Sequence, residues 1–368
     1  MKVKFNRAAL SEVLALVTTV VPSRTTKPIL QGLKINAKKD SVAISATDFE
    51  ISITCLIAQA QVEEEGEAVI PAERFAAIVR ESIDEVLELQ SAEGTCHVRG
   101  ADSHFTIYGY QPDQYPAVPG PDGKAQIKVN LPKLQEAIEH CLFATAKENT
   151  RYALSGILWE AAGKKLTIVG TDGRRLARYR LSLSAEVEKK IESEKIVVPA
   201  KAMALLDKIG AGEKDEAMIC IADNKIIIAC GSTVISSTLV EGNFPKYEEI
   251  IPTDHKNKLQ LNTAATLSAV KRAALLTNED SKGVKLSLSK KTLIFTCRAP
   301  EMGDAEIAME VDYKGEPMEI GFNPQFLVDV LRVIREDSFE LQLGQSDRPG
   351  LVKSGQNYLY VVMPVSLS

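Results

Sequence analysis

A glycine inside an apolar run, Ile29-Leu30-Gln31-Gly32-Leu33-Lys34-Ile35, is the most informative feature of this chain because the run is repeated. It returns 124 residues later as Ala153-Leu154-Ser155-Gly156-Ile157-Leu158-Trp159. It returns more weakly, after a further 127 residues, as Ser281-Lys282-Gly283-Val284-Lys285-Leu286. A proline that opens a helical pattern follows each copy, at Pro71, Pro199 and Pro324. Three copies of a domain-sized unit predict pseudo-symmetry, which favours an assembly surface over a single catalytic cleft.

The length of the chain agrees with a threefold repeat. A chain of 368 residues is long enough for two or three domains. Each copy has the pattern strand, helix, several strands, helix, several strands, which predicts an α+β layer structure. Loops rich in proline and charge, at Gln111–Gly123 and Phe244–Lys258, separate the copies. We therefore expect three domains, at residues 1–124, 125–251 and 252–368.

Two amphipathic helices are expected in each copy. Asn6 can cap the first helix, whose apolar positions Leu10, Val13, Leu14 and Val17 recur at helical spacing. Three other helices are expected to start at the repeated prolines, which are tolerated in a first turn. The remaining two should bury the positions Leu134, Ala137, Ile138, Cys141, Leu267, Val270 and Ala274.

The two ends of the chain are predicted to be strands. The alternating residues Met1–Phe5 suit an edge strand. The C-terminal segment from Tyr358 is also a strand candidate, and a terminal strand is typically an edge. The alternative is that Met363-Pro364-Val365 stays exposed and forms part of an apolar docking groove.

Composition indicates a globular protein of a reducing compartment. Apolar residues make up 45% of the chain and charged residues 25%, and no apolar run is long enough to span a membrane. The N-terminus lacks the apolar core of a signal peptide. Six cysteines occur without a Cys-x-x-Cys pair, and the four histidines do not cluster near them. We therefore expect buried thiols, no metal or other cofactor, and a cytoplasmic location.

The distribution of charge leaves two interpretations open. A net charge of −5 argues against a general nucleic-acid binder, although one confined surface can still be basic. The solvent faces of the predicted helices carry both signs and can form an ordinary mixed surface. Alternatively, six similar helices line one concave face whose positive excess contacts phosphates without reading sequence. The chain contains no helix-turn-helix, zinc-finger or RNP motif.

The segment Thr171-Asp172-Gly173-Arg174-Arg175-Leu176 is the one candidate for catalysis. Asp172 could act as a nucleophile or metal ligand while Arg174 and Arg175 bind phosphate. No carboxylate cluster or lysine motif accompanies it, and Asp-Gly is a common turn. The chain also lacks a Walker A motif and a Gly-x-Ser-x-Gly motif. We expect no catalytic residues, with an enzyme acting on a phosphorylated substrate as the alternative.

Several motifs, in order along nearly the whole chain, resemble those of the bacterial DNA polymerase III beta subunit family, the sliding clamps. The resemblance rests on these segments: Lys27-Pro-Ile-Leu-Gln-Gly-Leu, Thr47-Asp-Phe-Glu, Val69-Ile-Pro-Ala-Glu-Arg-Phe, Arg151-Tyr-Ala-Leu-Ser-Gly, Thr171-Asp-Gly-Arg-Arg-Leu-Ala, Gly242-Asn-Phe-Pro-Lys-Tyr, Gly321-Phe-Asn and Tyr360-Val-Val-Met-Pro. It implies a head-to-tail homodimer of three-domain chains that closes into a six-domain ring. Such a ring holds double-stranded DNA topologically, without sequence specificity.

The resemblance implies a non-enzymatic processivity factor for DNA replication. Its partners would be the replicative polymerase, a clamp loader and other proteins that carry a clamp-binding motif. A ring-forming relative that recruits partners without supporting replication is a further possibility. Glu249 and the tail Val365–Ser368 depart from the family pattern, so the ranking of partner motifs does not follow from it.

The resemblance also transfers three sets of site residues. DNA contacts would come from Arg24, Arg80, Lys147, Arg151, Tyr152 and Lys201. A groove for partner peptides would use Leu154, Thr171, Gly173, Arg174, Arg175, Leu176, Pro245, Ile250, Val361, Met363 and Pro364. At the dimer seam, Phe105 and Ile107 on an edge strand would meet Leu275 and Leu276 of the second chain.

Overall fold

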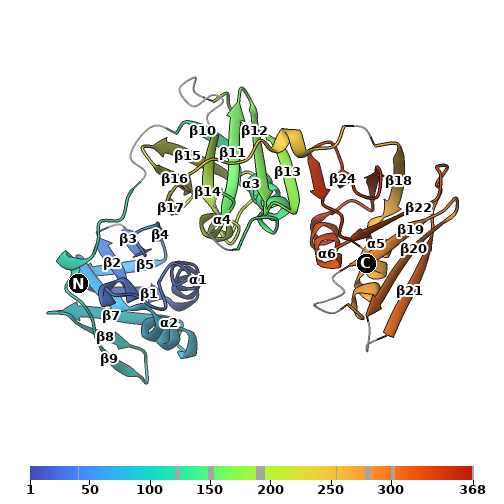
Figure 1. The fold of residues 1–368 in the computed structure, drawn as a ribbon. Coiled ribbons are helices and arrows are strands. Elements are labelled where there is room, and N and C mark those ends of the chain that lie inside the picture. The colour runs from blue at the N-terminus through green and yellow to red at the C-terminus, as the bar shows by residue number, and fades with distance from the viewer. Residues whose placement is uncertain are drawn as a thin grey trace. The chain divides into compact units, whose positions relative to one another are not determined.

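The same order of elements occurs three times along the chain (Figure 1). The structure, a computed structural model, describes residues 1–39, 41–120, 125–147, 153–187, 195–253, 255–277, 283–299 and 303–366. Each third has a strand, a helix, four or five strands, a second helix and three strands. This order confirms the pattern predicted from the repeats.

The elements of the first third are β1 (Lys2–Asn6), α1 (Arg7–Val17), β2 (Gly32–Lys38), β3 (Ser41–Thr47), β4 (Ile51–Ile57), β5 (Ala60–Glu64), β6 (Gly66–Pro71), α2 (Ala72–Glu81), β7 (Val86–Ala92), β8 (Thr95–Arg99) and β9 (His104–Tyr108). Those of the second are β10 (Ile127–Asn130), α3 (Leu131–Leu142), β11 (Gly156–Ala162), β12 (Lys165–Thr171), β13 (Arg175–Ser182), β14 (Lys195–Pro199), α4 (Ala200–Leu206), β15 (Glu216–Ala222), β16 (Lys225–Cys230) and β17 (Thr233–Thr238).

The elements of the last third are β18 (Asn257–Asn262), α5 (Thr263–Ala274), β19 (Val284–Leu288), β20 (Thr292–Ala299), β21 (Gly303–Glu310), β22 (Met318–Phe322), α6 (Pro324–Val333), β23 (Ser338–Leu343), β24 (Gly350–Ser354) and β25 (Tyr358–Val362). Short 3-10 turns lie at Pro28–Gln31, Pro112–Gln114 and Tyr247–Ile250.

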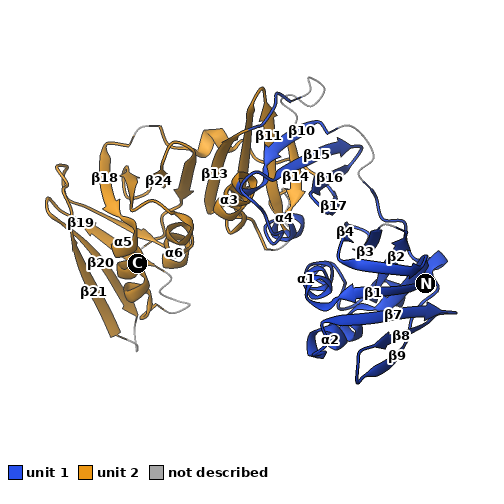
Figure 2. Cartoon of the chain, turned by 180° about the vertical axis from the view of Figure 1, so that it is seen from behind, with its two compact units in different colours: residues 1–132, 183–191, 201–239 blue, residues 133–182, 192–200, 240–368 orange. Residues whose placement is uncertain are grey.

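The chain divides into two compact units, and the residues of its middle third are shared between them (Figure 2). The first unit contains residues 1–132, 183–191 and 201–239, and the second contains residues 133–182, 192–200 and 240–368. The described strands of the first unit form the sheets β5-β1-β7-β8-β9 and β10-β15-β16-β17-β4-β3-β2-β6. Those of the second form the sheets β14-β11-β12-β13-β25-β24-β23-β18 and β21-β20-β19-β22.

The repeated glycines and prolines face each other across strand pairs. Gly32 lies opposite Pro71 in the β2–β6 pair, and Gly156 lies opposite Pro199 in the β11–β14 pair. A Cβ atom on Gly156 would approach the Val198 carbonyl oxygen to 2.3 Å, which no side chain can do. The motif therefore recurs because two backbones approach closely at the same point of the fold.

The predicted cap at Asn6 is confirmed, and two further helices have asparagine caps that were not predicted. Asn6, Asn262 and Asn323 each accept a hydrogen bond from the first turn of α1, α5 and α6, at 3.0, 2.9 and 2.9 Å. Pro324 is the first residue of α6, as expected. Pro71 and Pro199 instead end β6 and β14, and the helix begins one residue later. That prediction was wrong by one residue because the strand runs directly into the helix.

The buried helix faces follow most of the predicted stripes. Leu134, Ala137, Ile138 and Cys141 of α3 are fully buried. In α5 the predicted Val270 is buried, but Leu267 and Ala274 are only partly covered, and Ala269 and Ala273 are buried instead. Figure 1 shows α1 beside α2 and α5 beside α6, and each pair is in contact. All six cysteines are free thiols, five of them buried. Among the described helices, none is long and apolar enough to cross a membrane.

The C-terminal strand is not an edge. β25 lies between β13 and β24, with Val361 opposite both Leu176 and Leu351. The expectation of a terminal edge strand was therefore wrong, because β25 joins two runs of strands within one eight-stranded sheet. It was also wrong for the N-terminal strand, because β1 lies between β5 and β7. Met363, directly after β25, is 38% exposed, whereas Pro364 and Val365 are half-buried, and the docking groove stays a prediction.

Candidate functional site

The turn from β12 to β13 carries the motif that looked most like an active site. Thr171 Oγ1 donates to the Arg175 carbonyl at 2.6 Å and accepts from the Gly173 N–H at 3.1 Å. Asp172 Oδ1 accepts from the N–H groups of Arg174 and Arg175 at 2.9 and 3.1 Å. Gly173 has φ of 86°, which favours glycine. The aspartate therefore closes the turn, as its Asp-Gly sequence suggested.

Arg175 is a buried structural residue. Its Nε donates to Asp172 Oδ2 at 3.0 Å, its Nη1 to Asp329 Oδ2 at 2.6 Å and its Nη2 to the Phe143 carbonyl at 2.7 Å. The guanidinium also lies 4.4 Å from the centre of the Phe326 ring. Burial lowers the pKa of Arg175, but the carboxylates of Asp329 and Asp172 outweigh it and raise that pKa above its usual value.

These contacts do not fit the catalytic alternative. Both carboxylate oxygens of Asp172 are occupied by the turn and by Arg175. All three guanidinium nitrogens of Arg175 donate within the protein, so none is directed at a substrate phosphate. Arg174 remains exposed, and its carbonyl accepts from the Met363 N–H at 2.9 Å. The motif therefore has a structural role, and its Arg174 carbonyl bonds the segment that follows β25.

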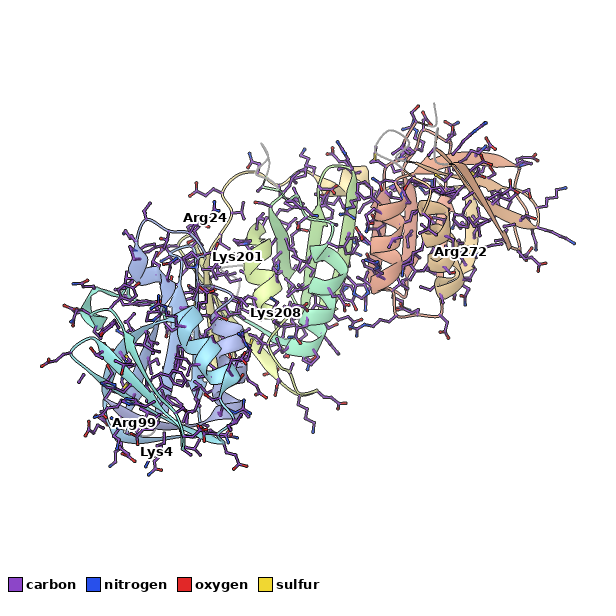
Figure 3. The ribbon with its side chains drawn as sticks, turned by 90° about the horizontal axis from the view of Figure 1, so that it is seen from below. Lys4, Arg24, Arg99, Lys201, Lys208 and Arg272 are labelled. Atoms are coloured by element: carbon purple, nitrogen blue, oxygen red, sulfur yellow. The ribbon has the colours of Figure 1, made fainter. Side chains whose placement is uncertain are left out.

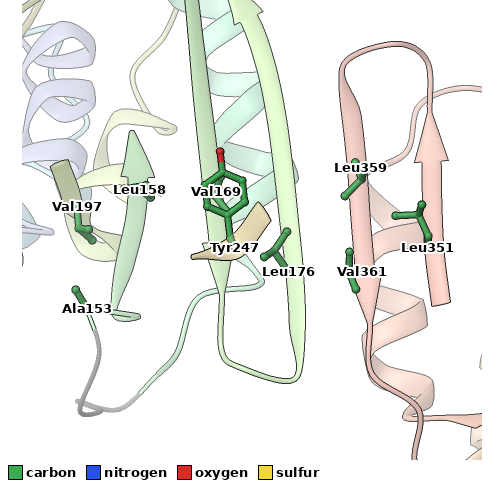
Figure 4. Close-up of a cluster of buried hydrophobic side chains, with 9 residues drawn as sticks. All are labelled: Ala153, Leu158, Val169, Leu176, Val197, Tyr247, Leu351, Leu359 and Val361. Carbon is green, nitrogen blue, oxygen red and sulfur yellow. The ribbon is translucent and has the colours of Figure 1, made fainter. Parts of the chain in front are cut away.

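An apolar cluster covers the sheet beside this turn (Figure 4). Its buried members are Ala153, Leu158, Val169, Leu176, Val197, Tyr247, Leu351, Leu359 and Val361. The partly buried residues Val240, Phe244 and Ile251 pack against them. Figure 4 shows Tyr247 over β12, with Leu176 and Val361 on the neighbouring strands. The 244–251 segment thus lies on the sheet as part of the site and is more than a linker.

Sequence reasoning missed Tyr247, the aromatic centre of this cluster. Its hydroxyl donates to Glu160 Oε2, and Lys195 Nζ bonds Glu160 Oε1 at 2.6 Å. Burial and the hydrogen bond to Glu160 raise the pKa of Tyr247. A signal was available, because Tyr115 and Tyr247 lie within the two proline-containing loops that separate the copies. Tyr115 is likewise buried and donates to the Gly32 carbonyl at 3.2 Å.

The predicted groove residues, all in the second unit, divide into buried and exposed ones. Leu154, Thr171, Arg175, Leu176 and Val361 are buried. Ile250 and Met363 are exposed by 40% and 38%, and both line an open hollow of about 820 Å³. The hollow also contains Glu249, Arg348 and Pro349. Pro245 and Pro364 are half-buried, and Gly173 and Arg174 are exposed.

The predicted seam residues lie at a sheet edge and after a helix. β9 is an edge strand, and Phe105 on it is 40% exposed beside a hollow of about 430 Å³ that Ile78 and Ile83 also line. Ile107 is buried within its own sheet, so its side chain offers little surface to a second chain. Leu275 is 75% exposed, whereas Leu276 is half-buried and its carbonyl accepts from the Cys297 thiol at 3.2 Å.

Four of the predicted DNA contacts are exposed cations. Arg24, Arg80, Lys147 and Lys201 are exposed, whereas Arg151 and Tyr152 lie outside the described residues. Arg80 pairs with Glu81 at 3.1 Å, and the Lys201 ammonium pairs with Asp48. In the first unit, Figure 3 shows Arg24, Lys201 and Lys208 apart from Lys4 and Arg99, which belong to the five-stranded sheet.

Comparisons with known proteins agree with this three-domain clamp fold over the whole chain. Family models of the DNA polymerase III beta subunit match in order: the N-terminal domain at residues 1–119, the central domain at 128–246 and the C-terminal domain at 248–366. A beta sliding clamp of Chlamydia pneumoniae is 31% identical over 368 residues, covering 100% of this chain and 99% of the relative. One of Pseudomonas aeruginosa is 31% identical, with 98% of each covered.

Solved structures of sliding clamps are also similar to this chain over its whole length. The DNA polymerase sliding clamp from Bacillus subtilis is 28% identical with a TM-score of 0.93, and each chain is covered by 100%. A sliding clamp from Pseudomonas aeruginosa bound to griselimycin is 29% identical with a TM-score of 0.93, again with full coverage of both chains. The chain therefore belongs to the DNA polymerase III beta subunit family, the beta sliding clamps.

Proposed function

We propose that this protein is a non-catalytic processivity factor that encircles duplex DNA and tethers the replicative polymerase. The observation that carries the proposal is the threefold repeat of one α+β unit along the whole chain, in a family whose relatives are named beta sliding clamps. Two chains joined head to tail would supply six such units. We place the protein in the cytoplasm and set its domain boundaries at 1–124, 125–251 and 252–368.

The ring seam would join β9 of one chain to the region after α5 of the next. Phe105 and its neighbouring hollow offer an apolar recess at an unpaired sheet edge. Leu275 projects with 75% of its surface exposed, which suits a side chain that enters a recess on another copy. Because the two surfaces differ, the contact is heterologous and two copies of it close a dimer.

The partner groove would be the apolar surface over β13 and β25. Leu176 and Val361 face each other there, and Ile250 and Met363 form the rim. In the preceding repeat, the places of Leu176 and Val361 are taken by Ser52 on β4 and Ser236 on β17. The apolar side chains of a short peptide would gain little binding energy from these serines. We therefore propose one groove per chain. Polymerase, clamp loader and other partners would compete for it.

DNA would be contacted without reading bases. Arg24, Arg80, Lys147 and Lys201 would meet phosphates, together with Arg151 and Tyr152 from outside the described residues. Such contacts release counterions, so their contribution weakens as salt rises. A net charge of −5 suits a protein whose outside repels DNA while one surface tolerates it.

The test is retention on circular DNA. The protein is loaded onto a nicked plasmid by a clamp loader and separated from free protein on a sizing column. We expect retention to disappear when the plasmid is cut once, because a ring can then slide off the end. Leu275→Asp, placed at the proposed seam, should abolish retention on the circle. Equal retention on circular and linear DNA would overturn the topological mechanism.

A further inference from the structure

Two turns of this chain have the same hydrogen bonds but differ at one position. In the turn from β3 to β4, Thr47 Oγ1 donates to the Ile51 carbonyl and accepts from the Phe49 N–H, both at 3.1 Å. Asp48 Oδ1 accepts from the N–H groups of Glu50 and Ile51 at 3.1 and 2.8 Å. The turn after β12 repeats each of these bonds, with Gly173 where Phe49 stands here.

Phe49 occupies a backbone conformation that suits glycine. Its φ is 78°, against 86° for Gly173. A bulky residue in the left-handed region is a genuine outlier and carries backbone strain. The ring does not recover that cost through burial, because 53% of the residue is exposed. Folding alone therefore gives no reason for an aromatic side chain at this turn.

One cation contacts the ring, and two others belong to neighbouring segments. Lys27 Nζ lies 4.5 Å from its centre, within cation–π range. Arg24 is three residues earlier on the same loop and is exposed. The Lys201 ammonium is held by Asp48, the residue next to Phe49, and its side chain remains 54% exposed. Arg24 and Lys201 are labelled in Figure 3, and both are exposed.

The strands next to this turn carry buried hydroxyl side chains where the second unit has its apolar pair. Ser45 and Thr54 bond each other at 2.9 Å, and Ser52 pairs with Ser236 across the β4–β17 pair. A peptide that buries apolar anchors would find no counterpart here of Leu176 and Val361. One exposed aromatic ring near exposed cations instead matches the requirements of an unpaired nucleobase, which stacks on a ring while its phosphates meet cations.

We propose that Phe49 and Lys27 form a stacking platform for an unpaired base of single-stranded DNA, with Arg24 and Lys201 taking the adjacent phosphates. The site would engage the single strand next to a primer–template junction. This use at a junction rests on the proposed function, which brings DNA to the protein. Binding of a free single-stranded oligonucleotide, by contrast, requires only the platform.

The test compares single-stranded and blunt duplex DNA. Binding of a fluorescent oligothymidine and of a blunt duplex is measured by fluorescence polarisation at low salt. Loss of base stacking in Phe49→Ala should weaken oligothymidine binding about 5- to 150-fold, the range expected for removing one aromatic–base contact. Duplex binding should stay within about twofold. The matched control is Leu56→Ala, which removes another exposed apolar side chain from the same sheet and should change neither.

Phe49→Gly separates binding from folding. Glycine relieves the left-handed strain, so the urea midpoint should rise while oligothymidine binding falls as it does in Phe49→Ala. Lys27→Gln should also weaken oligothymidine binding and should cause no other defect. Unchanged oligothymidine binding in both Phe49 variants would overturn the platform, and so would an equal loss on blunt duplex. Wild-type retention on circular DNA tests the encircling function separately.

Discussion

Arg174 and Arg175 are neighbours with the same chemistry, yet the fold uses them in opposite ways. Arg174 is exposed beside the groove, whereas Arg175 bonds Asp172, Asp329 and the Phe143 carbonyl. Arg174 belongs to the turn, whereas Arg175 is the first residue of β13 and is directed into the protein. Burial of one guanidinium with two carboxylates makes its removal costly, because each carboxylate is left without its partner.

We therefore expect Arg175→Ala to lower the free energy of unfolding by about 3–5 kcal/mol, the usual cost of breaking a buried pair. Arg174→Ala, the matched control, should change it by no more than about 0.5 kcal/mol, as is usual for an exposed residue. Urea unfolding followed by circular dichroism measures both. Similar values for the two variants would contradict the structural role assigned to Arg175.

His140 predicts a dependence of stability on pH. It is buried, its Nδ1 donates to the Glu136 carbonyl at 2.7 Å, and its ring lies 4.7 Å from that of Tyr358. Burial lowers the pKa of His140 below 6.5, so the folded protein holds fewer protons than the unfolded chain near that pH. Its contribution to stability is thus present above about pH 6.5 and is lost as pH falls.

The expected result is that the urea midpoint of the wild type falls between pH 7 and pH 5, and falls less in His140→Gln. Glutamine keeps a donor and does not titrate in this range. His104→Gln is the control, since His104 is exposed on β9. If His140→Gln shows the same pH slope as the wild type, another group is responsible.

At the scale of elements, the position of β25 decides how the C-terminus can be changed. Val361 and Val362 pair with Leu176 and Arg175 on one side and with Leu351 and Gly350 on the other. A strand with two neighbours has its backbone groups bonded on both sides, so its loss opens the sheet. Met363 and Pro364 follow the strand and belong to the rim of the proposed groove.

A chain that ends after Val362 should therefore keep its stability while losing partner-peptide binding. A chain that ends after Tyr360 should lose both, because two buried valines of an interior strand are removed. Thermal unfolding and peptide binding by fluorescence polarisation distinguish the two truncations. Full peptide binding by the chain that ends after Val362 would exclude Met363 and Pro364 from the groove.

At the scale of the whole molecule, β9 and β21 are edge strands, each paired on one side only. Edges of this kind invite association with another chain. β9 offers the exposed Phe105, while β21 alternates half-buried residues with the exposed Asp304, Glu306, Ala308 and Glu310. These are distinct surfaces, which suits a head-to-tail contact.

We expect light scattering at low micromolar concentration to give twice the 40.1 kDa mass of the chain. Phe105→Asp should give the mass of a single chain, because a charge would be buried at the seam. Leu56→Asp, at an exposed site on β4 away from either edge, is the control and should leave the mass doubled. A monomeric wild type would remove the closed ring under those conditions.

The sequence by itself determined the repeat, the order of elements, the cap at Asn6 and the family. These features depend on local chemistry: capping side chains, helical spacing, and glycines without room for a Cβ. It also named both walls of the proposed groove, Thr171–Leu176 and Val361–Pro364, because the motifs that carry the family resemblance include them. It missed Tyr247, which lies in a segment with the composition of a linker.

Only the tertiary structure decided which of those residues are buried and what they contact. Arg175 meets Asp329, 154 residues away, and Leu176 meets Val361 across a strand pair that joins two thirds of the chain. The burial of Ile107 and the interior position of β25 likewise could not be predicted from the local sequence. Such outcomes depend on which distant strands pair, and pairing is set by packing over the whole sheet, which no local window of sequence contains.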